Sequence, residues 1–567
     1  MNIINKGFLK LAMLPSSVYT KMGVDNNALS AILNIKLTMD DRRVNPMQQA
    51  RRGKSNKEVS SATIITMVVS AVLGFLYLVA FYIGANIVTG LTFYYFMFFF
   101  MLSATLIADF TSVLIDVRDT FIILPKPVND RTVLLARLLH IFIHICKLVL
   151  PMCLPGVVFV GIRYNIAGAI WMLPLILLLT LLAIFFINAV YIIILRITTP
   201  QKFQNVISYF QIVFAIVIYA SYQILPQMMQ KEEIANFDIT TISWAAFIPM
   251  YWMARAWESL TIFDFSGQSL IFIAASVFFP LLCIWFVIKF LAPSFNNKLA
   301  LINSMGDAPA SQAKKASYKG SGWLDKISRS LTKGDAESAG FLFAWKMSSR
   351  SRDFKLKVYP SIGYMVVLVV VIVLRSKMPV NALSAESQPF RVLMMMGIYL
   401  MSLLLVTALS QMVYSDKYKA AWIFAAAPVK YPGEVILGGV KAIVMKFFIP
   451  IVVLVAIPGI IVGGLQAVPN ILLALFNQLL ISALIVYINF RSLPFSRKQS
   501  VNVKTGSFIR SLGVTFLSVM IGILHYVIYE FTVVVWIGMA LSAIATWLIA
   551  GSIRKTGWGM IRAEEGE

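Results

Sequence analysis

Three basic side chains in one apolar stretch have a spacing that could do chemistry. His140, His144 and Lys147 fall at positions i, i+4 and i+7, so an α-helix places them on one face. Ionisable side chains inside a membrane-spanning segment are costly and usually functional. One interpretation is a polar patch that lines the route of an anionic headgroup. The other is a long helix whose first turns lie at the cytoplasmic interface, where basic side chains reach water. Lys446, which repeats Lys147 later in the chain, favours the second.

The motifs indicate no other chemistry. Two histidines four apart can hold a metal ion, but no Glu follows His140 and no third ligand is evident, so we expect no metal site. The sequence contains neither a GxxxxGKS/T phosphate-binding loop nor a GxSxG nucleophile motif. Apart from Asp109, the apolar stretches lack the carboxylates with which proton-coupled transporters relay charge. We therefore expect no cofactor in this chain, and we interpret His525 as a core residue.

The composition places these residues in a membrane protein. Of 567 residues, 59% are hydrophobic and 13% are charged, whereas soluble domains carry roughly 25% charged residues. Apolar runs near the roughly 20 residues that a helix needs to cross a bilayer recur along the chain. Because lipid offers the backbone no hydrogen bonds, we expect an all-α polytopic membrane protein with about twelve transmembrane helices. The expected spans are two within 59–108, with a hairpin at Gly84–Gly90, and then roughly 138–161, 167–195, 207–224, 270–290, 359–374, 392–412, 442–462, 468–490, 511–527 and 533–549.

The charge distribution predicts the orientation in the membrane. The sequence has 49 Lys+Arg against 25 Asp+Glu, a net charge of +24. The basic residues collect in segments 1–57, 118–137, 298–357, 417–446, 491–510 and 554–562, and loops rich in Lys and Arg stay in the cytoplasm. We expect a multi-pass protein of the cytoplasmic (inner) membrane with both termini inside, membrane lipids as neighbours and no nucleic-acid partner. The first apolar run begins near Ser61, so no signal peptide is expected.

Matching residues recur in the same order in two parts of the chain. The pairs are Lys147 and Lys446, Pro151 and Pro450, Pro127-Val128 and Pro428-Val429, Pro174 and Pro469, and Arg196 and Arg491. Any single pair has an alternative explanation, because prolines and lysines recur near helix ends throughout a membrane protein. The conserved order and the steady drift in spacing predict two parallel six-helix repeats, with a pathway along their interface.

Two segments carry a resemblance to a known family. Each follows the second span of its repeat, begins acidic, passes through an apolar turn and Pro-Val, and leads through basic residues into the next helix. This pattern resembles the cytoplasmic coupling segment of ABC-2-type exporter permeases, and basic segments before the first and seventh spans resemble that family's connecting helices. The coupling residues are Asp116, Arg118, Asp119, Pro127, Val128 and Arg131 in one copy and Asp416, Trp422, Pro428 and Val429 in the other; the connecting residues are Lys36, Arg42 and Arg43, and Lys346, Arg350 and Arg352.

With this resemblance, the chain divides into five expected parts. These are a cytoplasmic N-terminal connecting segment (1–60), a first six-helix half (61–293), a cytoplasmic linker with the second connecting helix (294–357), a second six-helix half (358–552) and a cytoplasmic tail (553–567). The two copies are not identical. The first has Pro125-Lys126-Pro127 where the family usually has one proline, and the second has no acid that matches Asp119. Unequal coupling is therefore expected.

Between the fifth and sixth spans, aromatic residues have near-helical spacing. Trp244, Phe247, Ile248, Tyr251 and Trp252 suit a helix that lies at the outer membrane interface. The segment is similar to the short external helices that the same family places before its last span.

The resemblance implies a function. It implies the permease subunit of an ATP-driven ABC exporter, which moves an amphipathic or lipid-like substrate and docks two separate ABC ATPase subunits that bind ATP and Mg. His140, His144, Lys147 and Lys446 are its candidate pathway residues. Two alternatives from other classes stay open. One is a membrane enzyme acting on lipid or polyprenyl groups with His140, His144 or Asp109 as acid or base; the other is an ion-coupled secondary transporter.

Overall fold

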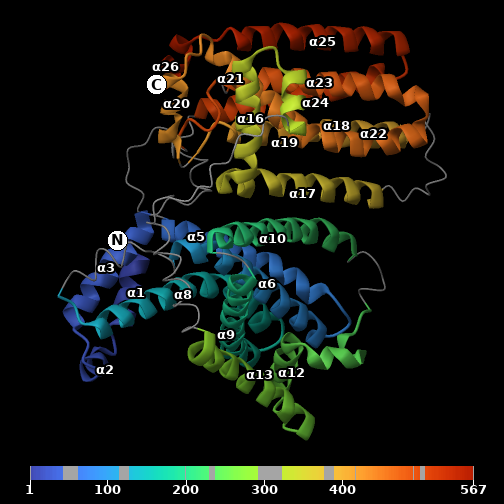
Figure 1. Ribbon diagram of the computed structural model, residues 1–567. Coiled ribbons are helices and arrows are strands. Elements are labelled where there is room, and N and C mark those ends of the chain that lie inside the picture. Colours follow the sequence, from blue (N-terminus) through green and yellow to red (C-terminus); the bar gives the residue numbers. More distant parts are fainter. Residues whose placement is uncertain are drawn as a thin grey trace. The chain divides into compact units, whose positions relative to one another are not determined.

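The computed structural model describes residues 2–42, 62–113, 127–197, 200–228, 236–291, 322–375, 388–415, 417–489, 491–498 and 505–565. Nearly all of these residues are helical, and within the same ranges there is no β-strand, only one isolated bridge between Tyr414 and Arg497. The prediction of an all-α polytopic membrane protein is confirmed (Figure 1).

The first part of the chain contains these elements: α1 (Ile3–Ala12), α2 (Ser16–Lys21), α3 (Asn26–Arg42), α5 (Ala62–Leu76), η1 (Tyr77–Tyr82), α6 (Ile87–Val113), α8 (Asp130–Arg163), α9 (Ile166–Ile197), α10 (Pro200–Met228), η2 (Ile239–Thr241), η3 (Ser243–Phe247), α12 (Pro249–Ile262), α13 (Gly267–Phe286) and η4 (Val287–Leu291). The predicted hairpin lies between η1 and α6. Gly84 has a φ of +87° there, in the left-handed region that favours glycine.

The second part continues with α15 (Trp323–Leu331), α16 (Asp335–Arg350), α17 (Arg352–Arg375), α18 (Gln388–Tyr399), α19 (Met401–Gln411), η6 (Tyr418–Ala421), α20 (Trp422–Ala426), α21 (Pro432–Ile443), η7 (Val444–Phe448), α22 (Ile449–Gly463), η8 (Leu465–Ala467), α23 (Val468–Asn489), α24 (Thr505–Ile528), α25 (Thr532–Arg554) and α26 (Trp558–Glu565). α18 and α19 together form one candidate membrane span, Phe390–Gln411, and α21, η7 and α22 together form another, Pro432–Gly463.

Ten helices among the described residues are long and apolar enough to cross a membrane. Each of the ten overlaps one of the twelve predicted spans; the first is Thr63–Tyr82 and the last is Thr532–Arg554. The two further predicted spans fall within α17 and α24, where the structure has one shorter apolar helix, Phe516–Ile528. The count of twelve therefore stays a prediction.

The helices form two compact units. The first comprises the described residues up to Ile207 and from Leu225 to Leu291; the second comprises Ser208–Ile224 and the described residues from Gly322 onward. The predicted first half (61–293) includes all of α10, whereas Ser208–Ile224 of that helix groups with the second unit. The predicted halves and the compact units are thus not identical, and the duplication stays a prediction.

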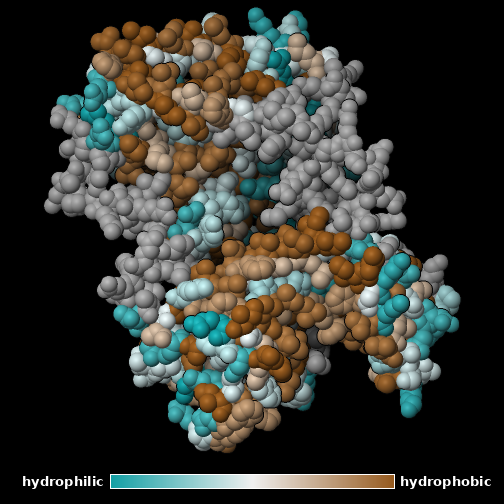
Figure 2. All heavy atoms as spheres, turned by 180° about the vertical axis from the view of Figure 1, so that it is seen from behind, coloured by the Kyte–Doolittle hydropathy of each residue, from teal (hydrophilic) through white to brown (hydrophobic). Residues whose placement is uncertain are grey.

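Each unit has its own apolar core and an apolar exterior. Tyr94, Phe98 and Leu179 are buried in the first core, and Phe341, Leu405 and Phe448 in the second. Outward-facing side chains such as Leu154 and Trp547 are 61% and 67% exposed. Figure 2 shows hydrophobic side chains over broad areas of the surface. In a spanning helix such side chains face lipid, so this exposure is what a membrane protein requires.

Candidate functional site

The third predicted span is much longer than a bilayer requires. α8 has 34 residues, about 51 Å at 1.5 Å per residue, against a hydrocarbon core of about 30 Å. Its first turns pack against α1–α3 around Tyr19, Leu29, Leu33 and Ala136. We call α1–α3 with these first turns of α8 the N-terminal lobe (Figure 1). The excess length of α8 therefore carries the contacts with α1–α3.

A buried ionic cluster joins α3 to α8 inside this lobe. His140 Nε2 lies 3.0 Å and Lys147 Nζ 3.7 Å from Asp40 Oδ2. The side chains of His140, Lys147 and Asp40 are 10%, 5% and 18% exposed. Burial raises the pKa of Asp40, but the hydrogen bond from His140 and the charges of His140, Lys147 and His144 outweigh it and hold the pKa below its usual value. We call Asp40, His140 and Lys147 the first latch.

The neighbouring carboxylate, Asp41, ties two further helices to the same end of α3. Its Oδ1 accepts hydrogen bonds from Asn5 Nδ2 at 2.8 Å and Thr63 Oγ1 at 2.6 Å, and its Oδ2 accepts one from the Asn2 backbone N–H at 2.7 Å. Asp41 is 2% exposed. α1, α3 and the first residues of α5 therefore meet at one polar point, where the first span begins at Thr63.

The second unit has a lysine contact of the same kind with different partners. Lys446 Nζ donates to Trp345 O at 2.9 Å, Ser348 Oγ at 2.7 Å and Ser349 Oγ at 2.5 Å, all on α16. It also lies 5.5 Å from the centre of the Trp345 ring. Lys446 lies in η7, a π-helical turn, a feature that is frequent at functional sites. We call Lys446 with Trp345, Ser348 and Ser349 the second latch.

Three of the four candidate pathway residues contact the predicted connecting helices. His140 and Lys147 contact α3, and Lys446 contacts α16. His144 is half-buried and contributes its charge to Asp40. Lys147 of α8 thus contacts α3 in the first unit, and Lys446 of η7 contacts α16 in the second. A role of these residues in a substrate pathway stays a prediction.

A second buried carboxylate reinforces the α16 contact. Glu337 of α16 is 1% exposed and lies 2.6 Å from Lys441 Nζ of α21 and 2.7 Å from Arg554 Nη2 of α25. Burial raises its pKa, and the hydrogen bonds and charges of Lys441 and Arg554 more than reverse that effect, so the pKa is lowered. Of the other predicted connecting residues, Lys346 and Arg350 are exposed, and Arg352 donates to Ser208 Oγ at 3.1 Å. Lys36 is half-buried, Arg42 is the last residue of α3, and Arg43 lies outside the described residues.

The lowered pKa of Glu337 predicts an acid-sensitive second unit. A carboxyl group with a depressed folded-state pKa stabilises the fold above its ordinary pKa of about 4.3 and loses that contribution as pH falls through the folded-state value. The apparent Tm should therefore fall on acidification below about pH 4.3. Glu337→Gln, measured in parallel by thermal unfolding, should show a smaller fall over the same range. Identical pH profiles for the two proteins would contradict the assignment.

Part of the predicted coupling residues can be placed. Asp116, Arg118, Asp119 and Asp416 lie outside the described residues. In the first unit, Pro127 is exposed, Val128 is half-buried, and Arg131 donates from Nη1 to Met22 O at 3.2 Å. Asn129, which the sequence reasoning missed, caps α8 by accepting from the Arg131 backbone N–H at 3.1 Å.

The second predicted coupling segment contains a short helix, α20, that ends before Pro428. Trp422 and Ile423 of α20 are 69% and 57% exposed. Phe424 packs on Phe343 of α16, with ring centres 5.3 Å apart. The half-buried Val429 accepts a hydrogen bond from Trp558 Nε1 at 3.0 Å through its carbonyl. An apolar, outward-facing pair is thus held on a helix that is fixed to α16.

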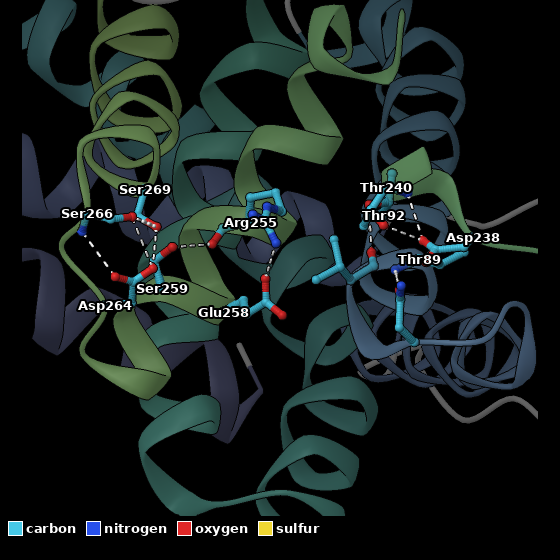
Figure 3. A network of polar contacts seen from close by, with 12 residues as sticks. Thr89, Thr92, Asp238, Thr240, Arg255, Glu258, Ser259, Asp264, Ser266 and Ser269 are labelled. Atoms are coloured by element: carbon cyan, nitrogen blue, oxygen red, sulfur yellow. Dashed lines mark hydrogen bonds and ion pairs between the residues drawn. The ribbon is translucent and has the colours of Figure 1, made fainter. Parts of the chain in front are cut away.

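The aromatic segment predicted as one helix after the fifth span forms two elements: Trp244 and Phe247 lie in η3, and Tyr251 and Trp252 lie in α12. Tyr251 and Trp257 are buried, and Trp257 Nε1 donates to Gly168 O at 2.8 Å, whereas Trp244 and Phe247 are 64% and 82% exposed. Asp238 and Asp264 flank this region; Asp238 caps η2, and Asp264 accepts hydrogen bonds from the Ser266 N–H and the Ser269 hydroxyl at the start of α13 (Figure 3). The Ser269 hydroxyl and the Ser266 N–H hold the pKa of Asp264 below its usual value. The hydrogen bond of Trp257 ties α12 to α9.

The sequence reasoning missed a polar chain inside the second unit. The Tyr399 hydroxyl lies 2.9 Å from His525 Nδ1 and accepts from Asn477 Nδ2 at 2.7 Å; Ser542 Oγ donates to Asn477 Oδ1 at 2.5 Å; His525 Nε2 lies 3.1 Å from Asn470 Oδ1. His525 is 1% exposed and both of its nitrogens are partnered, which confirms it as a satisfied core residue. The signal was present in the sequence, since Asn470 and Asn477 are seven apart on one face of an apolar helix.

Next to this chain is an apolar groove between α18–α19 and α24. Its volume is about 360 Å³, and Met395, Met396, Val519 and Ile523 line it. Tyr399 belongs both to the groove and to the polar chain. The groove can take an apolar chain, with a hydroxyl-rich polar network beside it.

Within the described ranges, no three His, Cys, Asp or Glu side chains lie close enough to hold a metal ion. Comparison with protein-family models, curated proteins and solved structures finds no match for this chain. The molecule is a multi-pass helical membrane protein.

Proposed function

We propose that this chain is the permease subunit of an ATP-driven exporter of the ABC-2 type, powered by separate ATPase subunits. The observation that carries the proposal is the pair of latches. In each unit, the helix that follows a predicted coupling segment holds a predicted connecting helix through one lysine, Lys147 or Lys446. A transporter driven from a soluble subunit needs such a rigid link between its docking segment and its membrane helices.

The described residues of each unit form such a link. In the second unit, Phe424 fixes α20 to α16, and Glu337 and Lys446 fix α16 to α21, η7 and α25. A push on α20 is therefore transmitted to a helix that spans the membrane. In the first unit, Arg131 and Asn129 fix the start of α8 to the α2–α3 turn, and the first latch fixes the end of α3 to α8. Packed elements of this kind move as rigid bodies.

The apolar groove of the second unit supports an amphipathic substrate. Its lining offers apolar contact, while Tyr399 and the polar chain behind it offer hydrogen bonds. A molecule with an acyl chain and a polar head satisfies both. Buried polar side chains in spans of a transporter commonly mark its substrate route.

Loss of Trp422 tests the docking of the ATPase. Purification from the native membrane in mild detergent should recover the chain with two ATPase subunits. Trp422→Ala should weaken this association at least about tenfold, because a central interface tryptophan typically contributes about 2 kcal/mol or more. The readouts are the ATPase recovered per chain and the ATP hydrolysis of the purified complex.

Trp547→Ala is the matched control. Trp547 is 67% exposed against 69% for Trp422, but it lies in the span Thr532–Arg554. A side chain that faces lipid cannot contact a soluble subunit, so this variant should retain the ATPase. Absence of any ATPase from the purified wild-type chain would refute the proposed function. Equal losses in both variants would refute the role of α20.

A further inference from the structure

The first two helices have an exposed apolar surface that no other described element covers. Ile3, Leu11 and Leu14 are 83%, 62% and 73% exposed, and Val18 and Met22 are 51% and 55% exposed. They lie on the outer side of the N-terminal lobe, whereas Leu9, Met13 and Tyr19 face its small core. Soluble surfaces rarely expose a contiguous group of large apolar side chains, so this face marks an interaction site.

The position of this surface is set by a buried amide. Asn5 of α1 is fully buried, and its Nδ2 donates to Leu37 O at 3.2 Å, Asp41 Oδ1 at 2.8 Å and Thr63 Oγ1 at 3.1 Å. Thr63 is the first residue of the first candidate span, Thr63–Tyr82. The Asn5 end of α1 is therefore fixed beside the first residue of that span, and α1 runs from there along α3 toward α2.

The charges on α1 and α2 indicate which kind of partner binds this apolar surface. Exposed Lys6 and Lys10 border the apolar face of α1, and exposed Lys21 lies on α2. Between Met1 and Val24 the sequence has no Asp or Glu. An apolar face edged by lysines, at the end of a span, matches a leaflet that has acyl chains below and anionic phosphates above.

We propose that α1 and α2 form a binding surface for an anionic lipid leaflet. The apolar side chains enter the boundary between acyl chains and headgroups, and the three lysines bind headgroup phosphates. Through Asn5, this contact also supports the junction of α3 with the start of α5. The surface is separate from α3, and the proposal does not depend on the proposed transport function.

An environment-sensitive label at Leu14 tests the proposal in the full-length chain. The label is NBD on Leu14→Cys in a background with Cys146, Cys153 and Cys283 replaced by alanine, because these are free thiols. The protein is placed in nanodiscs of phosphatidylcholine alone or of phosphatidylglycerol and phosphatidylcholine in equal parts. The NBD emission should shift to shorter wavelength in the anionic nanodiscs. A label at Asn27→Cys, an exposed position of the same lobe, should not shift.

Charge variants decide whether the lysines are responsible. Lys6→Glu/Lys10→Glu should abolish the shift at Leu14, and Lys6→Arg/Lys10→Arg should keep it. Each variant is first required to elute as a single species with the wild-type apparent Tm in detergent, where no anionic lipid is present. Emission at Leu14 typical of water in both lipids would overturn the proposal. So would an apolar environment at Leu14 that depends on neither lipid charge nor the lysines, since another occupant would then cover the face.

Discussion

Replacing Gly438 by alanine is expected to separate α16 from α21 and to destabilise the second unit by about 1–3 kcal/mol. A Cβ atom at Gly438 would lie 2.0 Å from Glu337 O and 2.8 Å from Phe341 N. From the other helix, a Cβ at Gly340 would lie 2.4 Å from Val435 O. Both obstacles are backbone atoms, which cannot rotate away. The helices must move apart, and the contacts of Glu337 and Lys446 must lengthen.

Gly439→Ala provides a control one residue away. Both substitutions gain the same intrinsic helix propensity, about 1 kcal/mol. At Gly439, however, the new Cβ would meet Met412 Sδ at 3.1 Å, the end of a flexible side chain that can move. We expect the apparent Tm in detergent to fall for Gly438→Ala and to stay or rise for Gly439→Ala. If the two variants unfold together, the close helix crossing does not hold the second unit.

The same substitution should also uncouple the proposed exporter. α20 reaches the membrane helices through α16, so a displaced α16 breaks that route. Gly438→Ala should therefore lower substrate-stimulated ATP hydrolysis while ATPase subunits still bind, because Trp422 and Ile423 remain exposed on α20. Loss of binding itself would assign the defect to docking instead.

The spans follow from the sequence because a bilayer imposes length and polarity. Runs of apolar residues have no alternative to helices in lipid, and the structure has helices at every predicted span. The helical periodicity that puts His140 and Lys147 on one face was also correct, since both contact Asp40. Local rules of this kind need no knowledge of the tertiary fold.

Partners that are distant in sequence could not be obtained in this way. Asp40 and His140 are 100 residues apart, and Tyr399 and His525 are 126 apart. Nothing in the local pattern around Lys147 distinguishes a snorkelling side chain from one that pairs with a carboxylate. Lys446 has the same local context and yet contacts hydroxyl and carbonyl oxygens. The choice depends on Asp40 in one connecting helix and on Ser348 and Ser349 in the other.

The first latch contains a carboxylate and the second does not, so removing Asp40 should strongly lower stability. Asp40→Ala leaves Lys147, whose side chain is 5% exposed, without its carboxylate. Breaking a buried ion pair by removing one partner typically costs about 3–5 kcal/mol, and the 18% exposure of Asp40 places the expected loss near the lower limit, about 3 kcal/mol. The N-terminal lobe should loosen, and the apparent Tm of the purified protein should fall.

The double variant Asp40→Ala/Lys147→Met separates pairing from packing. An apolar chain of similar length removes the uncompensated charge, so the double variant should recover most of the stability lost by Asp40→Ala. A double variant as unstable as Asp40→Ala would show that the carboxylate acts through His140 rather than Lys147. Thermal unfolding of the three proteins at neutral pH supplies the measurement, since Asp40, with its lowered pKa, is ionised there.

Lys446→Met should cost less than Asp40→Ala, because it leaves no charge behind. Trp345 O, Ser348 Oγ and Ser349 Oγ would each lose one donor, but all three are neutral groups, and Ser349 is exposed, so water replaces the lost donor there. Loosening the first latch should then reduce coupled ATP hydrolysis more than loosening the second. Equal losses of activity, despite unequal losses of stability, would show that each latch transmits motion to the same degree and that the ionic character of the first serves the fold alone.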